Sequence, residues 1–142
     1  MYTANQLEDA IVTAIENGGM KASVFGRKPS ADEFLKEVVT SPKVFVVFNG
    51  SAPGVRSAMK KRVLFSFHLY IVARNLRSPS SAARGDVVTG GGYNALDTAR
   101  NTLDGSDAGL NIQPIRFVRE SVFDKSDTQT VFRQEWELEI FE

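Results

Sequence analysis

The side chain best suited to act as a general base or a metal ligand occurs once in this chain, as His68. It directly follows Phe67 and lies two residues before Tyr70, inside an apolar segment. A hydrolytic triad or a zinc site needs more residues of these kinds, and the chain has no second histidine and no cysteine. We therefore predict that His68 is a packed or partly exposed strand residue, that there is no catalytic site, and that the protein is not an enzyme.

Three consecutive glycines, Gly90 to Gly92, precede a segment with helical periodicity. Backbone N–H groups at the start of a helix bind anions, so this pattern invites comparison with phosphate-binding loops. Those loops end in Gly-Lys followed by Ser or Thr and lie between parallel strands, and the sequence predicts neither feature. The glycines therefore favour a flexible hinge over a cofactor site.

Three aspartates, Asp86, Asp97 and Asp104, are carboxylates of the kind that bind divalent cations. Asp97 and Asp104 share a face of the predicted helix, but neither has an acidic partner one turn away on that helix. We interpret them as solvated helix charges, and we predict no metal and no cofactor.

Basic residues are concentrated in the middle of the chain, where no acidic residue occurs between Val38 and Gly85. The basic residues of this segment are Lys43, Arg56, Lys60, Lys61, Arg62, Arg74, Arg77 and Arg84. Such a cluster can contact phosphates, so a small nucleic-acid-binding module stays open as an alternative function. Against it, few aromatic residues interleave with the charges, and the formal net charge of the whole chain is zero.

The last strand-like segment carries Glu135, Glu137 and Glu139 at every second position. Like charges in alternation repel one another along one face of a strand. Two interpretations stay open, because the row either solubilises the protein and protects a sheet edge, or meets a basic surface of another subunit. In the second case we predict a subunit interface that contains these glutamates. Its basic residues would be Arg74, Arg77 and Arg84.

A strand, a loop and a helix in the middle of the chain must position these residues. Val63 to Arg74 alternates between two faces and is apolar enough on both for a central strand. A polar, turn-rich loop follows at about residues 76–92, and its length and composition predict that it is flexible in the free subunit. A helix then begins near Tyr93, and Gly105 is placed to end it.

Capping residues and alternation predict the remaining elements. Thr3 and Gln6 fit a capping box for a first helix that ends at Gly18 and Gly19. The last strand, Phe132 to Ile140, alternates the glutamates with a face that contains Trp136, so we expect Trp136 in the core. The other predicted elements are an edge strand from Met20 to Phe25, a helix from Ser30 to about Val39, a strand from Val44 to Phe48 bounded by Asn49 and Gly50, a loop from Ser51 to Met59, a strand from Ile112 to Phe123 and a turn from Asp124 to Thr128.

This order predicts a single α+β domain over residues 1–142, with a mostly antiparallel β-sheet and helices packed on one face. We expect the strands at 44–48 and 63–74 to pair antiparallel. The absence of cysteine excludes a disulfide scaffold and fits a reducing compartment. No apolar run approaches the roughly 20 residues that span a membrane, and the N-terminus lacks a signal-peptide pattern. We therefore expect no membrane partner and no export by a signal sequence.

Four short motifs occur in order along nearly the whole chain. They are Leu7 to Ile11, Pro42 to Gly50, the strand end Val72 to Arg77, and Tyr93 to Arg100 followed by Leu103 and Gly105. As an ordered set, these motifs resemble a family of tail proteins from Mu-like bacteriophages, whose namesake is Mu gene product thirty-seven.

The resemblance implies a tail-completion or tail-terminator protein with a small α+β subunit. Such proteins form a hexameric ring that caps the tail tube, stops the growth of tube and sheath, and provides a surface for joining the head. The implied partners are further copies of the chain, the tail tube protein, the sheath protein of a contractile tail and a head-joining or neck protein, with DNA at most passing through the ring lumen. The implied location is the virion, in the phage tail or neck, after assembly in the cytoplasm of the bacterial host. Another head–tail connector of similar fold is the alternative within the same class.

Overall fold

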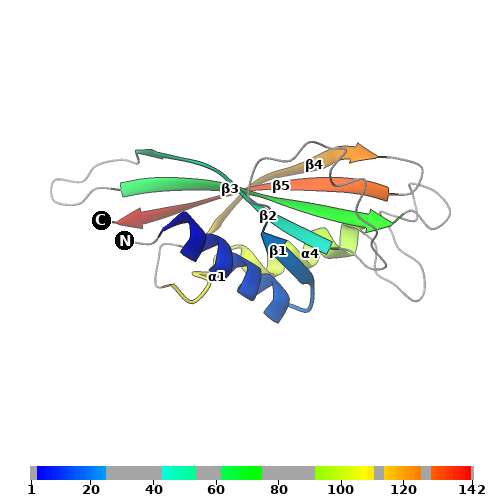
Figure 1. Ribbon diagram of the computed structural model, residues 1–142, viewed down its shortest axis with the longest axis horizontal. Helices are drawn as coiled ribbons and strands as arrows, with labels where there is room; N and C mark the ends of the chain where they lie inside the picture. Colours follow the sequence, from blue (N-terminus) through cyan, green and yellow to red (C-terminus); the bar gives the residue numbers. More distant parts are fainter. Residues whose placement is uncertain are drawn as a thin grey trace.

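The computed structural model describes residues 3–24, 43–53, 62–74, 92–110, 114–125 and 129–141. Its elements, labelled as in Figure 1, are α1 (Ala4–Asn17), β1 (Lys21–Val24), β2 (Lys43–Pro53), β3 (Arg62–Arg74), α4 (Gly92–Leu103), β4 (Arg116–Lys125) and β5 (Gln129–Phe141). The predicted helix from Ser30 to Val39 and residues 76–91 of the predicted loop lie outside the described residues.

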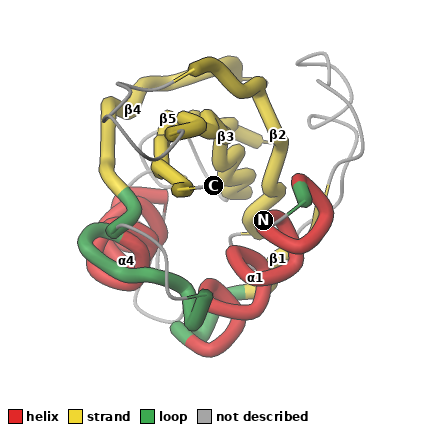
Figure 2. The backbone as a smooth tube through the Cα atoms, turned by 90° about the vertical axis from the view of Figure 1, so that its left-hand side faces the viewer, coloured by secondary structure: helices red, strands yellow, loops and turns green. Residues whose placement is uncertain are grey.

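The described strands form one sheet in the order β1-β2-β3-β5-β4. β1 runs parallel to β2, and the other neighbouring strands pair antiparallel, including β2 with β3 as predicted. Both α1 and α4 pack on the same face of the sheet (Figure 1), α1 against β1 and β2, and α4 against β3, β4 and β5 (Figure 2). The α+β fold with helices on one face is therefore confirmed.

The main core lies between this face and the two helices. Trp136 is 1% exposed there, as predicted. Its ring stacks on Phe67 at 6.3 Å between centroids, and the ring of Phe117 meets it edge-on at 5.3 Å. Such aromatic contacts stabilise the fold beyond the area that they bury. Trp136 therefore ties together β3, β4 and β5.

The opposite face of β2, β3 and β5 is also apolar at one end of the sheet. Five buried side chains form a second cluster there: Phe45, Val47, Tyr70, Val72 and Val131. The segment Val44 to Val47 is thus buried on both faces, which its continuous apolar sequence predicted.

Helix α1 begins at the predicted capping box. The backbone N–H of Gln6 donates to Thr3 Oγ1 at 3.2 Å, and the backbone N–H of Thr3 donates to Gln6 Oε1 at 2.8 Å. The helix then buries one stripe, Leu7, Ile11 and Ile15, and ends at Gly18. These contacts bear out the sequence analysis of this segment.

Several predicted boundaries were wrong. β2 continues through Asn49 to Pro53, where a turn and a loop had been expected, because the chain forms a bulge in which Gly50 has a φ of +148°. β4 begins at Arg116 rather than Ile112, and it extends to Lys125 in place of the predicted turn at Asp124. Gly92, assigned to the loop, is the first residue of α4.

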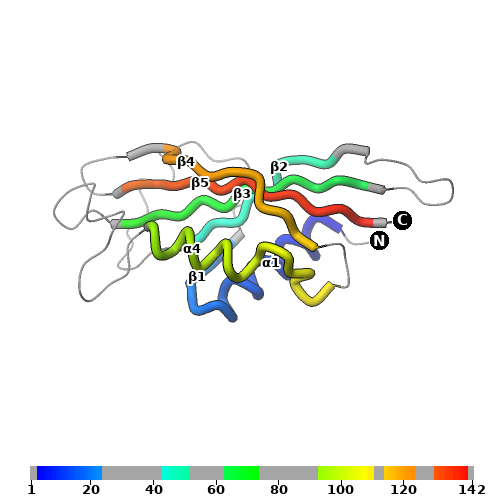
Figure 3. The backbone as a smooth tube through the Cα atoms, turned by 180° about the vertical axis from the view of Figure 1, so that it is seen from behind, coloured from blue at the N-terminus to red at the C-terminus, as the bar shows by residue number. Residues whose placement is uncertain are grey.

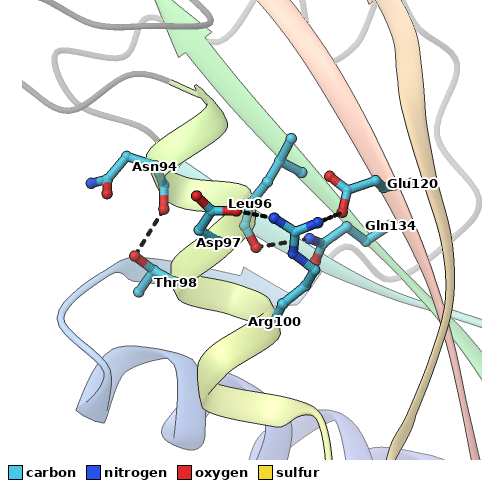
Figure 4. Close-up of polar contacts among 7 residues, drawn as sticks. All are labelled: Asn94, Leu96, Asp97, Thr98, Arg100, Glu120 and Gln134. Atoms are coloured by element: carbon cyan, nitrogen blue, oxygen red, sulfur yellow. Dashed lines mark hydrogen bonds and ion pairs between the residues drawn. The ribbon is translucent and has the colours of Figure 1, made fainter.

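Polar contacts attach α4 to the sheet (Figure 4). Arg100 Nη1 donates to Glu120 Oε1 on β4 at 2.7 Å, and Arg100 also pairs with Asp97 one turn earlier in α4. The fully buried Gln134 donates from Nε2 to the backbone oxygen of Leu96 at 3.0 Å. Because a buried amide without a partner is costly, Gln134 fixes the position of α4 over β5.

The C-terminal ends of the two helices approach closely at Gly18. A Cβ atom placed there would lie 2.7 Å from Thr102 Oγ1 and 3.3 Å from Thr102 Cγ2. The φ of Gly18 is −78°, which any residue adopts, so the close approach and not the backbone requires glycine.

We expect Gly18→Ala to destabilise the protein by roughly 1–3 kcal/mol, because the added methyl group overpacks the contact with Thr102. Chemical denaturation of Gly18→Ala, Thr102→Ala and the double variant measures this. In the Thr102→Ala background the cost of Gly18→Ala should largely disappear. An equal cost in both backgrounds would show that this contact does not limit helix packing.

Candidate functional site

Ionisable side chains gather on the sheet face opposite α1 and α4. We define the charged face by six residues from three adjacent strands: His68, Arg116, Arg119, Glu135, Glu137 and Glu139. The glutamates alternate along β5, and the arginines reach them from β4. This face contains the glutamates predicted as interface residues.

Two arginines of β4 form ion pairs with all three glutamates. Arg119 binds Glu135 through Nε and, at 3.3 Å, through Nη2. Arg116 Nη2 lies 3.0 Å from Glu137 Oε1 and 3.3 Å from Glu139 Oε1, so it serves two carboxylates. The repulsion expected within the glutamate row is thus offset inside one subunit.

The glutamates are partly covered, whereas the arginines reach into solvent. The side chains of Glu135, Glu137 and Glu139 are 18%, 30% and 22% exposed, and those of Arg116 and Arg119 are 53% and 69% exposed. Exposed ion pairs of this kind are screened and contribute little to folding stability. The ion pairs of the charged face therefore contribute little to holding the fold together.

His68 lies on β3, directly opposite Glu135 of β5. Its Nε2 is 3.6 Å from Glu135 Oε1, and its Nδ1 is 3.4 Å from the hydroxyl of Tyr70. The residue is 6% exposed, so of the two predicted states, packed or partly exposed, His68 is the packed strand histidine. His68, Glu135 and Arg119 occupy matching positions on β3, β5 and β4.

The surroundings shift the pKa of two groups here. Hydrogen bonds from Arg119 lower the pKa of Glu135, opposed by partial burial and supported by the charges of Arg119, Arg133 and His68. Burial raises the pKa of Tyr70, against the stabilising influence of Arg133 on the phenolate. At neutral pH, Glu135 is therefore ionised and Tyr70 keeps its proton.

The sequence analysis missed Arg116 and Arg119 because a bulge changes the alternation of β4. Phe117 pairs with Trp136 and Arg119 with Glu135, so Val118 is an extra residue in the ladder. Strict alternation would place residues 116 and 119 on opposite faces, whereas the bulge brings both to the glutamates. The exposed Pro114 was the only sequence signal of irregularity near this strand.

The structure places only part of the predicted interface. Glu135, Glu137 and Glu139 lie together on β5, and Arg74 is the last residue of β3. The side chain of Arg74, and all of Arg77 and Arg84, lie outside the described residues, so their contact with the glutamates stays a prediction. The interpretation of the glutamates as protection for a sheet edge was wrong, because β5 lies between β3 and β4.

Of the three candidate aspartates, Asp97 and Asp104 lie within the described residues, whereas Asp86 does not. Asp97 is paired with Arg100, and the exposed Asp104 accepts a hydrogen bond from the backbone N–H of Phe117 at 3.4 Å. Within the described ranges, no three His, Asp or Glu residues are grouped so that they could hold a metal ion. Neither α1 nor α4 is long and apolar enough to cross a membrane. An open groove of about 610 Å³ beside α1 is lined mainly by small residues, such as Ala10, Thr13 and Thr102.

The chain matches a model of a known protein family. The family model described as "Bacteriophage Mu, Gp37" matches residues 4–141, which is nearly the whole chain. No curated protein matches the chain.

We expect Glu135→Gln to lower stability at neutral pH, because ionised Glu135 is stabilised by Arg119 in the folded state. A folded pKa below the unfolded value contributes stability above the unfolded pKa, and this contribution is lost as the pH falls through the folded pKa. The difference in melting temperature between the parent and Glu135→Gln should therefore shrink in acid. In an Arg119→Gln background the effect should be smaller at neutral pH, and a difference independent of pH and of Arg119 would contradict this account.

Proposed function

Because this chain belongs to the bacteriophage Mu Gp37 family, we propose that it is a tail-terminator protein, which caps the end of the phage tail tube as a ring. The observation that carries the proposal is the family match over residues 4–141. Membership supports a bacteriophage structural protein and a place in the virion. The proposed refinement is a hexameric ring that stops the growth of tube and sheath and provides the head-joining interface.

The charges of the chain suit a ring of identical subunits. A ring requires heterologous contacts, in which two different surfaces of each subunit meet. The chain supplies a segment between Val38 and Gly85 with basic but no acidic residues, and a row of three glutamates on β5. We propose that Arg74, Arg77 and Arg84 of one subunit contact Glu135, Glu137 and Glu139 of the next.

This role requires binding and geometry but no bond-making. The proposed partners are the tail tube protein, the sheath protein of a contractile tail and a neck protein, with DNA at most passing through the lumen. The single histidine is buried beside Tyr70, which fits a protein without a hydrolytic site.

The ring can be tested with the purified chain. We expect light scattering to give a mass near six times that of one 15.6-kDa chain, and electron microscopy to show rings. Adding the rings to growing tail tubes should limit tube length. A protein that assembles but joins heads without limiting tubes would be a connector instead. Monomers that shift DNA mobility with a steep dependence on salt would favour a nucleic-acid-binding module.

Charge reversal tests the proposed contact. Arg77→Glu together with Arg84→Glu should weaken ring formation, most strongly at low salt, because each rim ion pair contributes on the order of 1 kcal/mol or less. Adding Glu135→Lys and Glu137→Lys should partly restore assembly.

The glutamate variants need their own control, because Glu135 and Glu137 also pair with Arg119 and Arg116 within the subunit. Their melting temperature should be measured without the arginine changes. If the arginine reversal assembles like the parent at low salt, the contact lies elsewhere.

A further inference from the structure

Three large apolar side chains of the described ranges are highly exposed, and they lie on β4 and in the first turn of α4. They are Tyr93 at 53%, Val118 at 49% and Val122 at 57%. Val118 and Val122 lie on β4. Tyr93 lies in the first turn of α4, with its ring 6.0 Å from that of Phe132, the residue that pairs with Val122. We call Tyr93, Val118 and Val122 the β4 edge patch.

The strand that carries this patch stands at the end of the described sheet. Among the described strands, β4 pairs with β5 alone and lies at the opposite end of the order from β1 (Figure 3). An edge strand offers backbone N–H and C=O groups to an added chain, and bulges commonly limit such pairing. In β4 the bulges fall after Phe117 and after Val122, which leaves Arg119 to Val122 as a regular four-residue stretch.

We propose that the β4 edge patch is the apolar centre of a subunit–subunit contact, and that its occupant is a second copy of this chain. The inference rests on the proposed ring and adds where its apolar contact lies. The stretch Arg119 to Val122 receives an extended backbone segment of the neighbour, and the three exposed side chains are buried around it.

The charged face alone is too weak for the purpose. Its ion pairs are largely exposed, and stable interfaces obtain most of their energy from buried apolar and aromatic anchors at the centre of the contact. Scattered exposed apolar residues need no explanation, but here Tyr93 and Val122 both neighbour Phe132, and Val118 lies on the same edge strand as Val122. Aromatic and branched side chains along one edge strand are the composition expected of such a centre.

Two features favour a second copy as the occupant. The patch adjoins the charged face along β4, because Val118 directly precedes Arg119, which pairs with Glu135. Glu137, at 30% exposure, shares Arg116 with Glu139 and so retains acceptor capacity for another cation. The basic middle segment of this chain supplies cations without accompanying carboxylates. A neighbour that pairs along β4 therefore meets apolar side chains and the charged face from the same edge of the sheet.

The test compares assembly of the full-length parent with two double variants at β4. Val118→Lys with Val122→Lys places charges at the proposed centre. Val118→Thr with Val122→Thr keeps the branched shape and strand preference and adds no charge. Asn49→Lys is the control for an added lysine charge, because it places one lysine at an exposed position on β2, which β3 and β5 separate from β4. Light scattering over a concentration series gives assembly, and melting temperature confirms folding.

We expect the lysine variant to raise the concentration for half-assembly about tenfold or more, the threonine variant to raise it less, and Asn49→Lys to behave like the parent. If the parent assembles and both β4 variants assemble equally well, the contact is overturned while the ring stands. Variants that form normal rings but no longer bind tail tubes assign the patch to the tube protein and also overturn it. A parent that stays monomeric at every concentration overturns both the ring and this contact.

Discussion

The pairing of β3 with β5 determines the rest of this structure. The two strands run antiparallel over their full length, with Phe67 opposite Trp136 and His68 opposite Glu135. Because successive side chains point to opposite faces, a slip of one residue would move Trp136 to the charged face and Glu135 against α4. Gln134 also favours this register, because it is fully buried there and forms hydrogen bonds with the backbone oxygen of Leu96 and with the indole N–H of Trp136. The apolar face and the charged face are therefore two consequences of one alignment.

The alignment of β5 places three glutamates on one face of the sheet, and arginines of β4 neutralise them there. A row of glutamates on one strand is repulsive, and β4 offsets the repulsion by presenting Arg116 and Arg119. The bulge at Val118 makes this possible because it returns both arginines to the same face. The same bulge exposes an apolar side chain beside the ion pairs. A neighbour that uses these glutamates must share them with the arginines already bound, so electrostatics can orient the contact but cannot supply most of its energy.

The sequence predicted the elements whose signals are local. The capping box of α1, the alternation of β3 and β5 and the burial of Trp136 depend on neighbours within one segment, and each was correct. What failed depends on distant pairing. Asn49 and Gly50 read as a turn, yet β3 continues beside them and converts them into a bulge. Hairpin order does not reveal which strand of β4 and β5 neighbours β3, so protection of a sheet edge stayed open as one interpretation of the glutamates, although the described edge is β4. The ion pairs could not be predicted for the same reason, because they depend on the pairing of β4 with β5 and on the bulge in β4.

Symmetry restricts how the β4 edge can be used in a ring. If β4 paired with β4 of a second copy about a two-fold axis, the β4 edges of both copies would be covered, and assembly would stop at a dimer. A ring instead requires that β4 meet a different surface, which leaves one unused surface at each end of the growing chain of subunits until the ring closes. The sheet has such an arrangement, with β4 at one end and β1 at the other, where α1 packs. α1 carries Glu8, Asp9 and Glu16 and no basic residue, so the two ends of the subunit differ in chemistry as well as position. Unlike ends favour head-to-tail association over two-fold pairing, and head-to-tail association is the geometry from which a closed ring is built.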